Sequence, residues 1–252
     1  RQRLVDHSTC AMTGIYRDGS YLDQNPDWHE GDAKWKADQI EELFRRNGLA
    51  PRSVVEIGCG AGGILRELAM RSNPNCAYAG YEISEQAYQL CTRQPTRGVT
   101  YHHGDLLAAP PDVTFDVSLA IDVFEHVDDY IGFLRALHGR ARQHVFHIPL
   151  DLSVQTVLRS SPILKGRSLV GHLHYFTKET ALATLTDTGY EVVDHFYTGS
   201  SLDAPNRRLR PRLIKFPRRV AFRLNRDLTV RVLGGWSLLV LARTAPHRPG
   251  PL

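Results

Sequence analysis

A glycine-rich segment between an apolar run and a helical run is the feature that most constrains the fold of this chain. Residues 53–58 read Ser-Val-Val-Glu-Ile-Gly, and residues 58–63 read Gly-Cys-Gly-Ala-Gly-Gly before a helical pattern begins at Ile64. Glycine lets a backbone turn sharply and approach a ligand closely, while the start of a helix offers free N–H groups. The pattern predicts a strand, a ligand-binding turn and a helix in immediate succession.

Strand and helix patterns alternate along the rest of the chain. We predict strands at 53–57, 77–81, 99–102, 115–121, 144–148, 190–197 and 236–243. We predict helices at 28–47, 64–71, 84–93, 128–139 and 177–189. This alternation indicates an α/β fold of the Rossmann-like, doubly wound type, with a mostly parallel sheet covered by helices on both faces.

Acidic residues stand at three positions that would line the glycine turn. Glu56 precedes the first glycine by two residues, Glu82 ends the second predicted strand, and Asp105 follows the third. Carboxylates there could bind an ammonium group, a ribose diol and an adenine amino group, respectively. The same glycines also satisfy the G-x-G-x-x-G pattern, so an NAD-dependent oxidoreductase is an alternative, although Glu56 stands where those enzymes usually carry an apolar residue.

With these motifs the chain resembles the class I S-adenosylmethionine-dependent methyltransferases over residues 54–243. The resemblance includes residues 115–127, Phe-Asp-Val-Ser-Leu-Ala-Ile-Asp-Val-Phe-Glu-His-Val, and residues 172–177, His-Leu-His-Tyr-Phe-Thr. It implies S-adenosyl-L-methionine as the cofactor and an antiparallel last strand. The cofactor-binding residues that it implies are Glu56, Gly58, Cys59, Gly60, Glu82, Ile83, Asp105, Leu106 and Ile121.

Three histidines are candidates for catalysis. A hydroxyl acceptor benefits from a base with a pKa near neutrality, which favours histidine. His126 follows the fourth predicted strand, at the edge where open α/β sheets bind ligands, and His172 and His174 precede the late helix. Each histidine has an alternative role in packing. His126 could pack against the helix that follows it, and His172 and His174 could pack within an extended segment. His147, on the fifth strand, is a weaker candidate.

Motifs that the chain lacks narrow the class of methyl acceptor. Residues 120–123 read Ala-Ile-Asp-Val, without the proline that accompanies amino methylation of nucleobases, and no Pro-Cys pair is present for C5 methylation. Metal-assisted catechol chemistry would use clustered oxygen ligands such as an Asp-Asn pair, and the chain has no such pair. We therefore predict no metal site. The resemblance implies a small-molecule acceptor, with O-methylation favoured, in secondary-metabolite, sugar or polysaccharide metabolism.

Residues before the glycine turn supply the candidates for acceptor binding. Residues 1–50 are predicted to form an arm and a lid helix, and residues 51–252 the Rossmann-like methyltransferase domain. Aromatic side chains at Tyr16, Trp28 and Trp35 could wall an acceptor pocket and exclude water. Alternatively, Trp35 only docks the first helix on the sheet.

Positive charge is concentrated in one connection. The chain has a net charge of +4, but residues 205–231 hold ten Lys or Arg against one acid, a local +9 that leaves −5 elsewhere. They belong to a long connection, 198–235, predicted as a basic insertion before the final strand, with Pro217 in the first turn of a helix. This segment could meet an acidic or carrier-bound acceptor or an anionic membrane surface, or remain solvated. An RNA-directed binding module is an alternative of another class, disfavoured because no RNA-binding motif accompanies the basic residues.

Cysteines and apolar runs bear on the compartment. Cys10, Cys59, Cys76 and Cys91 form no C-x-x-C pair, which favours a reduced chain. No apolar run approaches the ~20 residues that a membrane span needs. We therefore expect a cytoplasmic protein, whose oligomeric state the sequence does not indicate.

Overall fold

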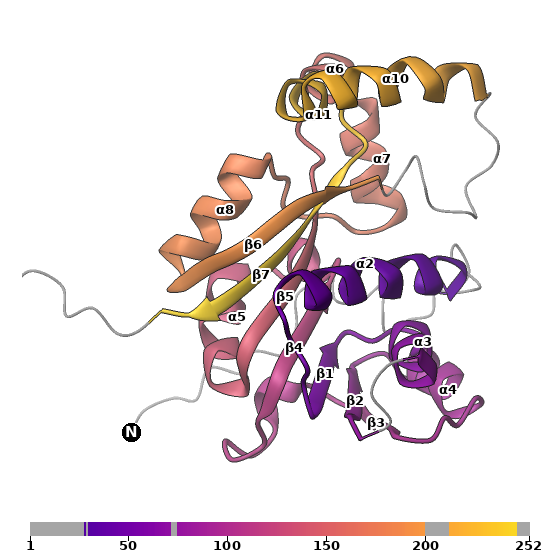
Figure 1. Cartoon of the computed structure of the whole chain (residues 1–252), viewed down its shortest axis with the longest axis vertical. Coiled ribbons are helices and arrows are strands. Elements are labelled where there is room, and N and C mark those ends of the chain that lie inside the picture. The colour runs from indigo at the N-terminus through magenta and orange to yellow at the C-terminus, as the bar shows by residue number, and fades with distance from the viewer. Residues whose placement is uncertain (1–27, 29, 72–74, 200–211, 246–252) are drawn as a thin grey trace, which may run out of the picture.

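A seven-stranded sheet forms the centre of the computed structural model, which describes residues 28, 30–71, 75–199 and 212–245. The strands are β1 (Ser53–Ile57), β2 (Ala77–Glu82), β3 (Val99–His103), β4 (Phe115–Ile121), β5 (Ala141–Pro149), β6 (Tyr190–Thr198) and β7 (Ser237–Thr244). Their order is β3-β2-β1-β4-β5-β7-β6 (Figure 1). Only β7 is antiparallel to its neighbours β5 and β6, so the predicted mostly parallel sheet with an antiparallel last strand is confirmed.

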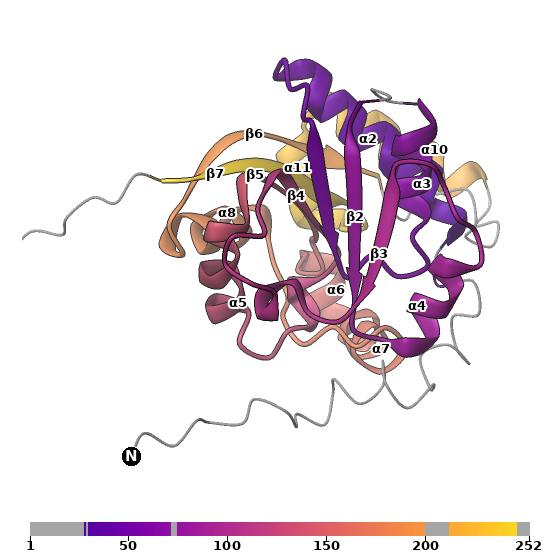
Figure 2. The same cartoon turned by 90° about the horizontal axis from the view of Figure 1, so that it is seen from below.

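Helices cover both faces of this sheet, as Figure 2 shows. The described α-helices are α2 (Ala33–Arg46), α3 (Gly63–Arg71), α4 (Glu85–Thr92), α5 (Tyr130–Leu137), α6 (Val154–Arg159), α7 (Ser161–Leu169), α8 (Lys178–Asp187), α10 (Arg212–Leu224) and α11 (Arg226–Leu233). Side chains cap two of the predicted helices: Ser84 accepts from the amide of Ala87, and Thr177 forms a capping box with Thr180. Sequence analysis missed α6 and α7, which bury no residue and so carry no clear apolar period.

Two hydrophobic cores lie on opposite faces of the sheet. Successive residues of β7 alternate between them, with Leu238 in the core beside α5 and α8 and Leu239 in the core beside α2 and α3. Both residues are at most 1% exposed. Because the central strands are buried on both faces, they read in the sequence as continuous apolar runs.

Helix α2 is part of the second core. Ala37, Ile40 and Leu43 are at most 1% exposed and pack with residues of β1, α3 and β7. The structure therefore joins the predicted lid helix to the sheet through its apolar face, and the residues before it, 1–27, lie outside the described part of the chain.

Two helices, α10 and α11, form most of the described part of the predicted basic insertion between β6 and β7. Helix α10 begins at Arg212, and Pro217 lies inside it, so the prediction that Pro217 occupies the first turn is wrong. That prediction used the preference of proline for a helix start, but a helix can continue past a proline at the loss of one main-chain hydrogen bond. The guanidinium of Arg218 donates to the carbonyl oxygens of Leu233 and Gly234, which attaches α10 to the end of α11. None of the described helices is long and apolar enough to cross a membrane.

Candidate active site

The glycine turn lies between the carboxyl end of β1 and the first residue of α3. Gly58, Gly60 and Gly62 have φ values of +65°, +55° and +75°, in the left-handed region that favours glycine. The amide of Gly58 donates to the carbonyl oxygen of Tyr81 at 2.8 Å, which ties the turn to β2. A Cβ atom on Gly60 would lie 2.6 Å from a ring carbon of Trp28. Glycine is therefore required here both by the backbone conformation and by the aromatic ring.

Glu82 holds the glycine turn from the neighbouring strand. It ends β2 and is 5% exposed. Its Oε2 accepts from the amide of Gly60 and its Oε1 from the amide of Ser84, each at 2.8 Å. Burial raises the pKa of Glu82, although these two amides act in the opposite direction. Each carboxylate oxygen keeps a second lone pair, so Glu82 can also accept from the hydroxyls of a ligand.

A second buried carboxylate, Glu56, lies at the end of β1 just before the turn. It is 2% exposed, and its Oε2 has no hydrogen-bond partner. Burial raises the pKa of Glu56 well above its usual range, and the charge of nearby Lys36 offsets only part of this effect. Because an unsatisfied buried acceptor is costly, a ligand that brings a cationic N–H donor here would stabilise the site.

The other predicted cofactor-binding residues differ in their exposure and contacts. Asp105 follows β3, and its Oδ1 accepts from the amide of Leu107 at 2.8 Å. Ile83 is 37% exposed next to Glu82, so its side chain can meet a ligand. Leu106 and Ile121 are buried in the two cores, where they support the ends of β3 and β4.

Cys59 is packed beneath the turn. Its Sγ lies 4.0 Å from that of Cys91, whose thiol donates to the carbonyl oxygen of Gly60 at 2.9 Å. The contact with Cys91 and burial raise the pKa of Cys59 well above its usual range. A thiol that stays protonated is a poor nucleophile, so Cys59 is a packing residue of the turn rather than a reactive thiol. Cys59, Cys76 and Cys91 are all free, while Cys10 lies outside the described residues.

A network of ionic and hydrogen-bonded side chains begins where β4 ends. Asp122 has a φ of +56°, and its carboxylate lies 2.6 Å from Nδ1 of His147 and 2.8 Å from Nζ of Lys36. Burial alone would raise the pKa of Asp122, but His147 and Lys36 outweigh it and hold this pKa well below its usual range. Nε2 of His147 lies 2.8 Å from Oγ1 of Thr198. Sequence analysis missed Lys36 and Asp122, because their pairing joins segments far apart in the chain.

Two of the three predicted catalytic histidines meet beside this network. The ring centroids of His126 and His172 are 5.0 Å apart. Nδ1 of His126 lies 3.1 Å from the carbonyl oxygen of Gly171, and Nδ1 of His172 lies 2.6 Å from Oδ2 of Asp151. Burial, followed by the proximity of His172, lowers the pKa of His126 to about 4, so its imidazole is neutral at pH 7.

Glu125 stands beside these histidines and was not predicted. Its side chain is fully buried, and neither carboxylate oxygen has a hydrogen-bond partner. Its Oε1 lies 3.7 Å from Nε2 of His126. Burial raises the pKa of Glu125 well above its usual range, and the charge of Asp122 adds to the effect. Glu125 could have been found from its position in the sequence, because it is an acid next to a candidate histidine just after a strand end where such sheets bind ligands.

The third predicted histidine, His174, makes different contacts. Its Nε2 lies 2.9 Å from the carbonyl oxygen of Val127, and its ring centroid lies 4.3 Å from that of Tyr130. These contacts attach the segment before α8 to the start of α5. They favour the packing role for His174.

The predicted acceptor-binding aromatics are separated. Trp28 lies against Gly60 of the glycine turn, whereas Trp35 meets the ring of His147 edge-on at 6.2 Å between centroids. Trp28 therefore lies beside the glycine turn and Trp35 beside the network of Asp122. Tyr16 lies outside the described residues.

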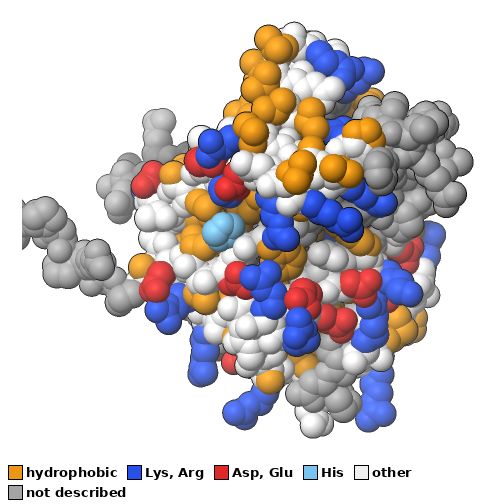
Figure 3. Space-filling view, turned by 45° about the horizontal axis from the view of Figure 1, so that its top comes forward, with side chains coloured by type: hydrophobic (Ala, Val, Ile, Leu, Met, Phe, Trp, Pro, Cys, Tyr) orange, Lys and Arg blue, Asp and Glu red, His pale blue; other side chains and the backbone are white. Residues whose placement is uncertain are grey.

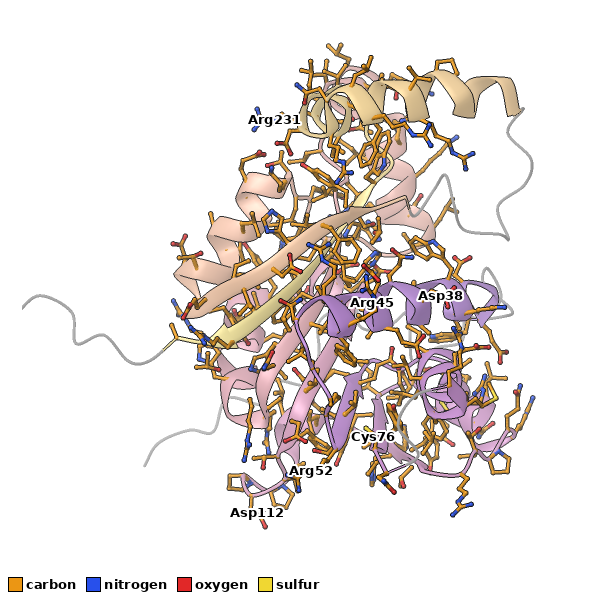
Figure 4. The ribbon with its side chains drawn as sticks, in the orientation of Figure 1. Asp38, Arg45, Arg52, Cys76, Asp112 and Arg231 are labelled. Carbon is orange, nitrogen blue, oxygen red and sulfur yellow. The ribbon has the colours of Figure 1, made fainter. Side chains whose placement is uncertain are left out.

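A depression of about 500 Å³ lies away from these residues. Asp38 and Arg45 of α2 and Cys76 before β2, all labelled in Figure 4, are among the residues that line it. Cys76 precedes β2, at the opposite end of the strand from Glu82. Since α/β sheets bind ligands at the carboxyl ends of their strands, this depression is not the candidate site.

Comparison with known protein families assigns the chain to a family. A family model described as a methyltransferase domain matches residues 28–195. The chain belongs to this methyltransferase family. The match begins at Trp28 and contains the glycine turn, Glu82, Asp105 and His126. The resemblance drawn from the sequence, including the class I S-adenosylmethionine-dependent type, is confirmed.

Curated relatives of this methyltransferase are distant. Ajmaline N-methyltransferase from Rauvolfia serpentina is 32% identical over 114 residues, which is 41% of this chain and 38% of the relative. The mitochondrial ubiquinone biosynthesis O-methyltransferase of Schizosaccharomyces pombe is 28% identical over 114 residues, 42% of this chain and 40% of the relative. The matches span about two fifths of the length of these relatives.

A solved structure extends the likeness to nearly the whole methyltransferase. Magnesium protoporphyrin IX methyltransferase from Synechocystis PCC 6803, determined with bound SAH, superposes with a TM-score of 0.57 and 15% identity. The superposition covers 96% of this chain and 90% of that protein. At this identity the likeness shows the shared fold, and it confirms the predicted Rossmann-like architecture.

Proposed function

We propose that this methyltransferase binds S-adenosyl-L-methionine at the glycine turn and transfers its methyl group to a small molecule, with a hydroxyl oxygen as the favoured acceptor. The observation that carries the cofactor assignment is Glu56, whose buried Oε2 has no partner beside a turn that only glycine can form. This acceptor fits the ammonium group of an amino-acid-bearing cofactor. When bound, S-adenosylmethionine would supply an electrophilic methyl group and its own leaving group.

The chain's own residues would bind and orient this cofactor. Glu82, which holds Gly60, would accept from the ribose hydroxyls, and Asp105 would accept from the adenine amino group. Ile83, the residue after Glu82, offers exposed apolar surface. Trp28, in contact with the turn, would exclude water from it.

Favoured O-methylation rests on the groups beyond β4. His126 and His172 lie beyond the carboxyl end of β4 with their ring centroids 5.0 Å apart, and the fully buried Glu125 lies beside His126. A neutral imidazole offers a lone pair that can accept a hydrogen bond from an acceptor hydroxyl and so orient its oxygen. Because the pKa of His126 is lowered to about 4, this residue would orient the hydroxyl rather than take its proton. Positioning of the acceptor against the methyl group supplies much of the remaining rate enhancement.

The names of relatives and the motifs that the sequence lacks support the proposed acceptor class. Two of the curated relatives are named ajmaline N-methyltransferase and ubiquinone biosynthesis O-methyltransferase. We place this protein in secondary-metabolite, sugar or polysaccharide metabolism and in the cytoplasm. The free thiols of Cys59, Cys76 and Cys91 agree with a reducing compartment.

Thermal unfolding with candidate ligands tests the cofactor assignment. S-adenosylhomocysteine at concentrations well above its Kd is expected to raise the Tm, and NAD is not. The opposite result would replace the methyltransferase assignment with a nicotinamide-dependent one. A methyl-transfer screen against hydroxylated and aminated metabolites, read by S-adenosylhomocysteine release, then identifies the acceptor atom.

A surface that is both apolar and basic refines the proposal, because it favours a methyl acceptor that is membrane-associated or lipid-linked. Exposed apolar side chains gather on α6, α10 and α11, including Val157, Leu158, Leu224 and Leu228. Figure 3 shows apolar and basic side chains together at this end of the molecule, and Arg231, labelled in Figure 4, belongs to it. Exposed apolar residues flanked by arginines suit the interface of an anionic bilayer.

Vesicle flotation tests this surface. Binding is expected to vesicles that contain phosphatidylglycerol, to be weaker for phosphatidylcholine alone and to fall with added salt. Leu158→Asp and Leu224→Asp should abolish it, whereas Met70→Asp, at an exposed site on α3, should not. Retained flotation of the two surface variants contradicts the refinement, and binding to tRNA but not to vesicles would favour the RNA-directed alternative instead.

A further inference from the structure

Glu125, His126 and His172 form a cluster whose packing leaves a carboxylate unsatisfied. One carboxylate oxygen of Glu125 and one ring nitrogen of each histidine lie within 4.8 Å of one another. Glu125 is fully buried, and neither of its oxygens accepts a hydrogen bond. A buried carboxylate without donors is costly, and a cation held by the three groups would remove that cost.

We propose that Glu125, His126 and His172 bind one divalent transition-metal ion, with Zn²⁺ as the first candidate. Two imidazole nitrogens and one carboxylate oxygen are a ligand set that Zn²⁺ takes in catalytic sites, where three protein ligands leave one position open. At about 2.0–2.2 Å from a tetrahedral metal, two ligand atoms lie about 3.4 Å apart. The ligand atoms of this cluster lie within 4.8 Å of one another, so binding requires the side chains to close by up to about 1.4 Å.

Both imidazoles are already oriented as metal ligands usually are. A histidine ligand commonly donates its other ring N–H to a carboxylate or a backbone carbonyl. Nδ1 of His172 lies 2.6 Å from Asp151, and Nδ1 of His126 lies 3.1 Å from the carbonyl oxygen of Gly171. With hydrogen on Nδ1, Nε2 carries the lone pair, and Nε2 of His126 is the nitrogen 3.7 Å from Glu125. Asp151 is thus a positioning residue for His172.

The nearby acid Asp122 does not join this ligand set. Its carboxylate is committed to Lys36 and His147, at 2.8 Å and 2.6 Å. Glu125 therefore remains as the acidic ligand. This proposal departs from the expectation of no metal site, which rested on the lack of an Asp-Asn pair rather than on the histidines.

The position of the cluster connects it to the proposed methyl transfer, on which this step rests. A Cβ atom on Gly58 would lie 3.3 Å from the side chain of Val123, so Val123 packs against the glycine turn. Glu125 comes only two residues later, which brings the cluster close to the turn. An acceptor hydroxyl at the open position would lose its proton to solvent more readily. Its oxygen lone pair would then form the new C–O bond as the methyl–sulfur bond breaks, and that electron pair would stay on the sulfur of S-adenosylhomocysteine.

Metal titration of the full chain tests the site. Protein without a polyhistidine tag is stripped with a chelator and titrated with Zn²⁺ by calorimetry and with Co²⁺ by visible absorbance. We expect one equivalent of either ion, and preference for Mg²⁺ over Zn²⁺ would overturn the nitrogen ligation. Glu125→Gln and His172→Ala should lose this binding, and Asp151→Asn should weaken it about 10- to 100-fold. His195→Asn, at an exposed histidine of β6, is the matched control and should bind as the parent does.

S-adenosylhomocysteine binding to the same samples separates this proposal from the proposed function. Protein that binds the homocysteine product but no Zn²⁺ overturns the metal site and leaves the methyltransferase assignment intact. Undiminished Zn²⁺ binding by Glu125→Gln, or the same loss in His195→Asn, also overturns it. If Glu125→Gln unfolds, as judged by circular dichroism, the Zn²⁺ affinity of Asp151→Asn tests the proposal instead. A purely structural Asp151 would not change this affinity, so an unchanged affinity would overturn the metal site.

Discussion

Oε2 of Glu82 accepts a hydrogen bond from the amide of Gly60 at 2.8 Å, so the last residue of β2 fixes the conformation of the turn that follows β1. Glu82 is buried, and its other oxygen binds the amide of Ser84 at the start of α4. One carboxylate thus joins the two loops between which the cofactor is proposed to lie. The acid predicted to bind ribose also builds the site that would hold it.

Replacement of Glu82 by glutamine should weaken cofactor binding more than it destabilises the protein. The amide group of Gln can accept from only one of the two N–H groups, and it lacks the charge that strengthens bonds to ribose hydroxyls. At about 1.5–3 kcal/mol for bonds to a charged group, the Kd for S-adenosylhomocysteine should rise about 10- to 100-fold. Calorimetric titration measures it, with Glu85→Gln on exposed α4 surface as the control. An unchanged Kd for Glu82→Gln would remove this residue from the site.

Gly60→Ala should impair the turn for a steric reason that Gly139→Ala does not share. Gly60 has a φ of +55°, and a Cβ atom there would meet the ring of Trp28 at 2.6 Å. A Cβ on Gly139 would meet nothing within 4 Å. We expect a loss of about 1–3 kcal/mol in the free energy of unfolding for Gly60→Ala, together with weaker S-adenosylhomocysteine binding. Urea unfolding checks this, and equal stability of the two variants would contradict it.

Loss of the Asp122 charge should destabilise the ion-pair network. Asp122→Asn is the appropriate change, since asparagine tolerates the φ of +56° and the result then reports on charge rather than on backbone strain. Lys36 and His147 would lose a charged partner, which should cost about 2–4 kcal/mol. Urea unfolding of Asp122→Asn, Lys36→Met and the double variant gives the coupling energy. Additive losses would show that the two groups do not stabilise one another.

Stability should decline in mild acid because of His144. This β5 residue is fully buried, with Nδ1 2.7 Å from Oγ of Ser118. Burial, followed by the nearby His138, lowers the pKa of His144 to about 3, against about 6.5 in an unfolded chain. Between these values only the unfolded chain binds the proton, so the free energy of unfolding falls as pH falls.

The contribution of His144 should reach about 1.4 kcal/mol per pH unit within the window from about 6.5 to 3. Urea unfolding at a series of pH values measures the slope, which should be shallower for His144→Asn. His195→Asn, at an exposed site of β6, serves as the comparison for the substitution itself. Parallel slopes for all three proteins would assign the acid sensitivity to other groups.

Much of the fold was predictable because its signals are local. Strand β4 at 115–121 was predicted with its observed bounds, and Ser84 and Thr177 act as the predicted helix caps. Apolar period, glycine position and capping residues act within a few residues of one another, so a linear sequence contains them. Helices α6 and α7 escaped prediction because they bury no residues that would mark a period.

The residues of the candidate site likewise fall into those that local sequence signals indicate and those that only the folded chain brings together. The glycine turn, Glu56, Glu82 and Asp105 could be found from the sequence because each stands at a fixed place relative to a strand end. The pairing of His126 with His172, the exclusion of His174 from that pair, and the buried Glu125 depended on how the segment before α8 folds against the end of β4. Spacing along the chain does not encode such long-range contacts.

The sequence by itself determined the alternation of strands and helices, the turn that requires glycine and the carboxylates around it, because these follow from local backbone chemistry. Only the tertiary structure decided which side chains share a buried environment. Lys36 meets Asp122, and Glu125 meets two histidines, through packing of distant segments in which water is replaced by protein. Burial of this kind sets the pKa of a group and its need for a partner, and it exists only once the chain has folded.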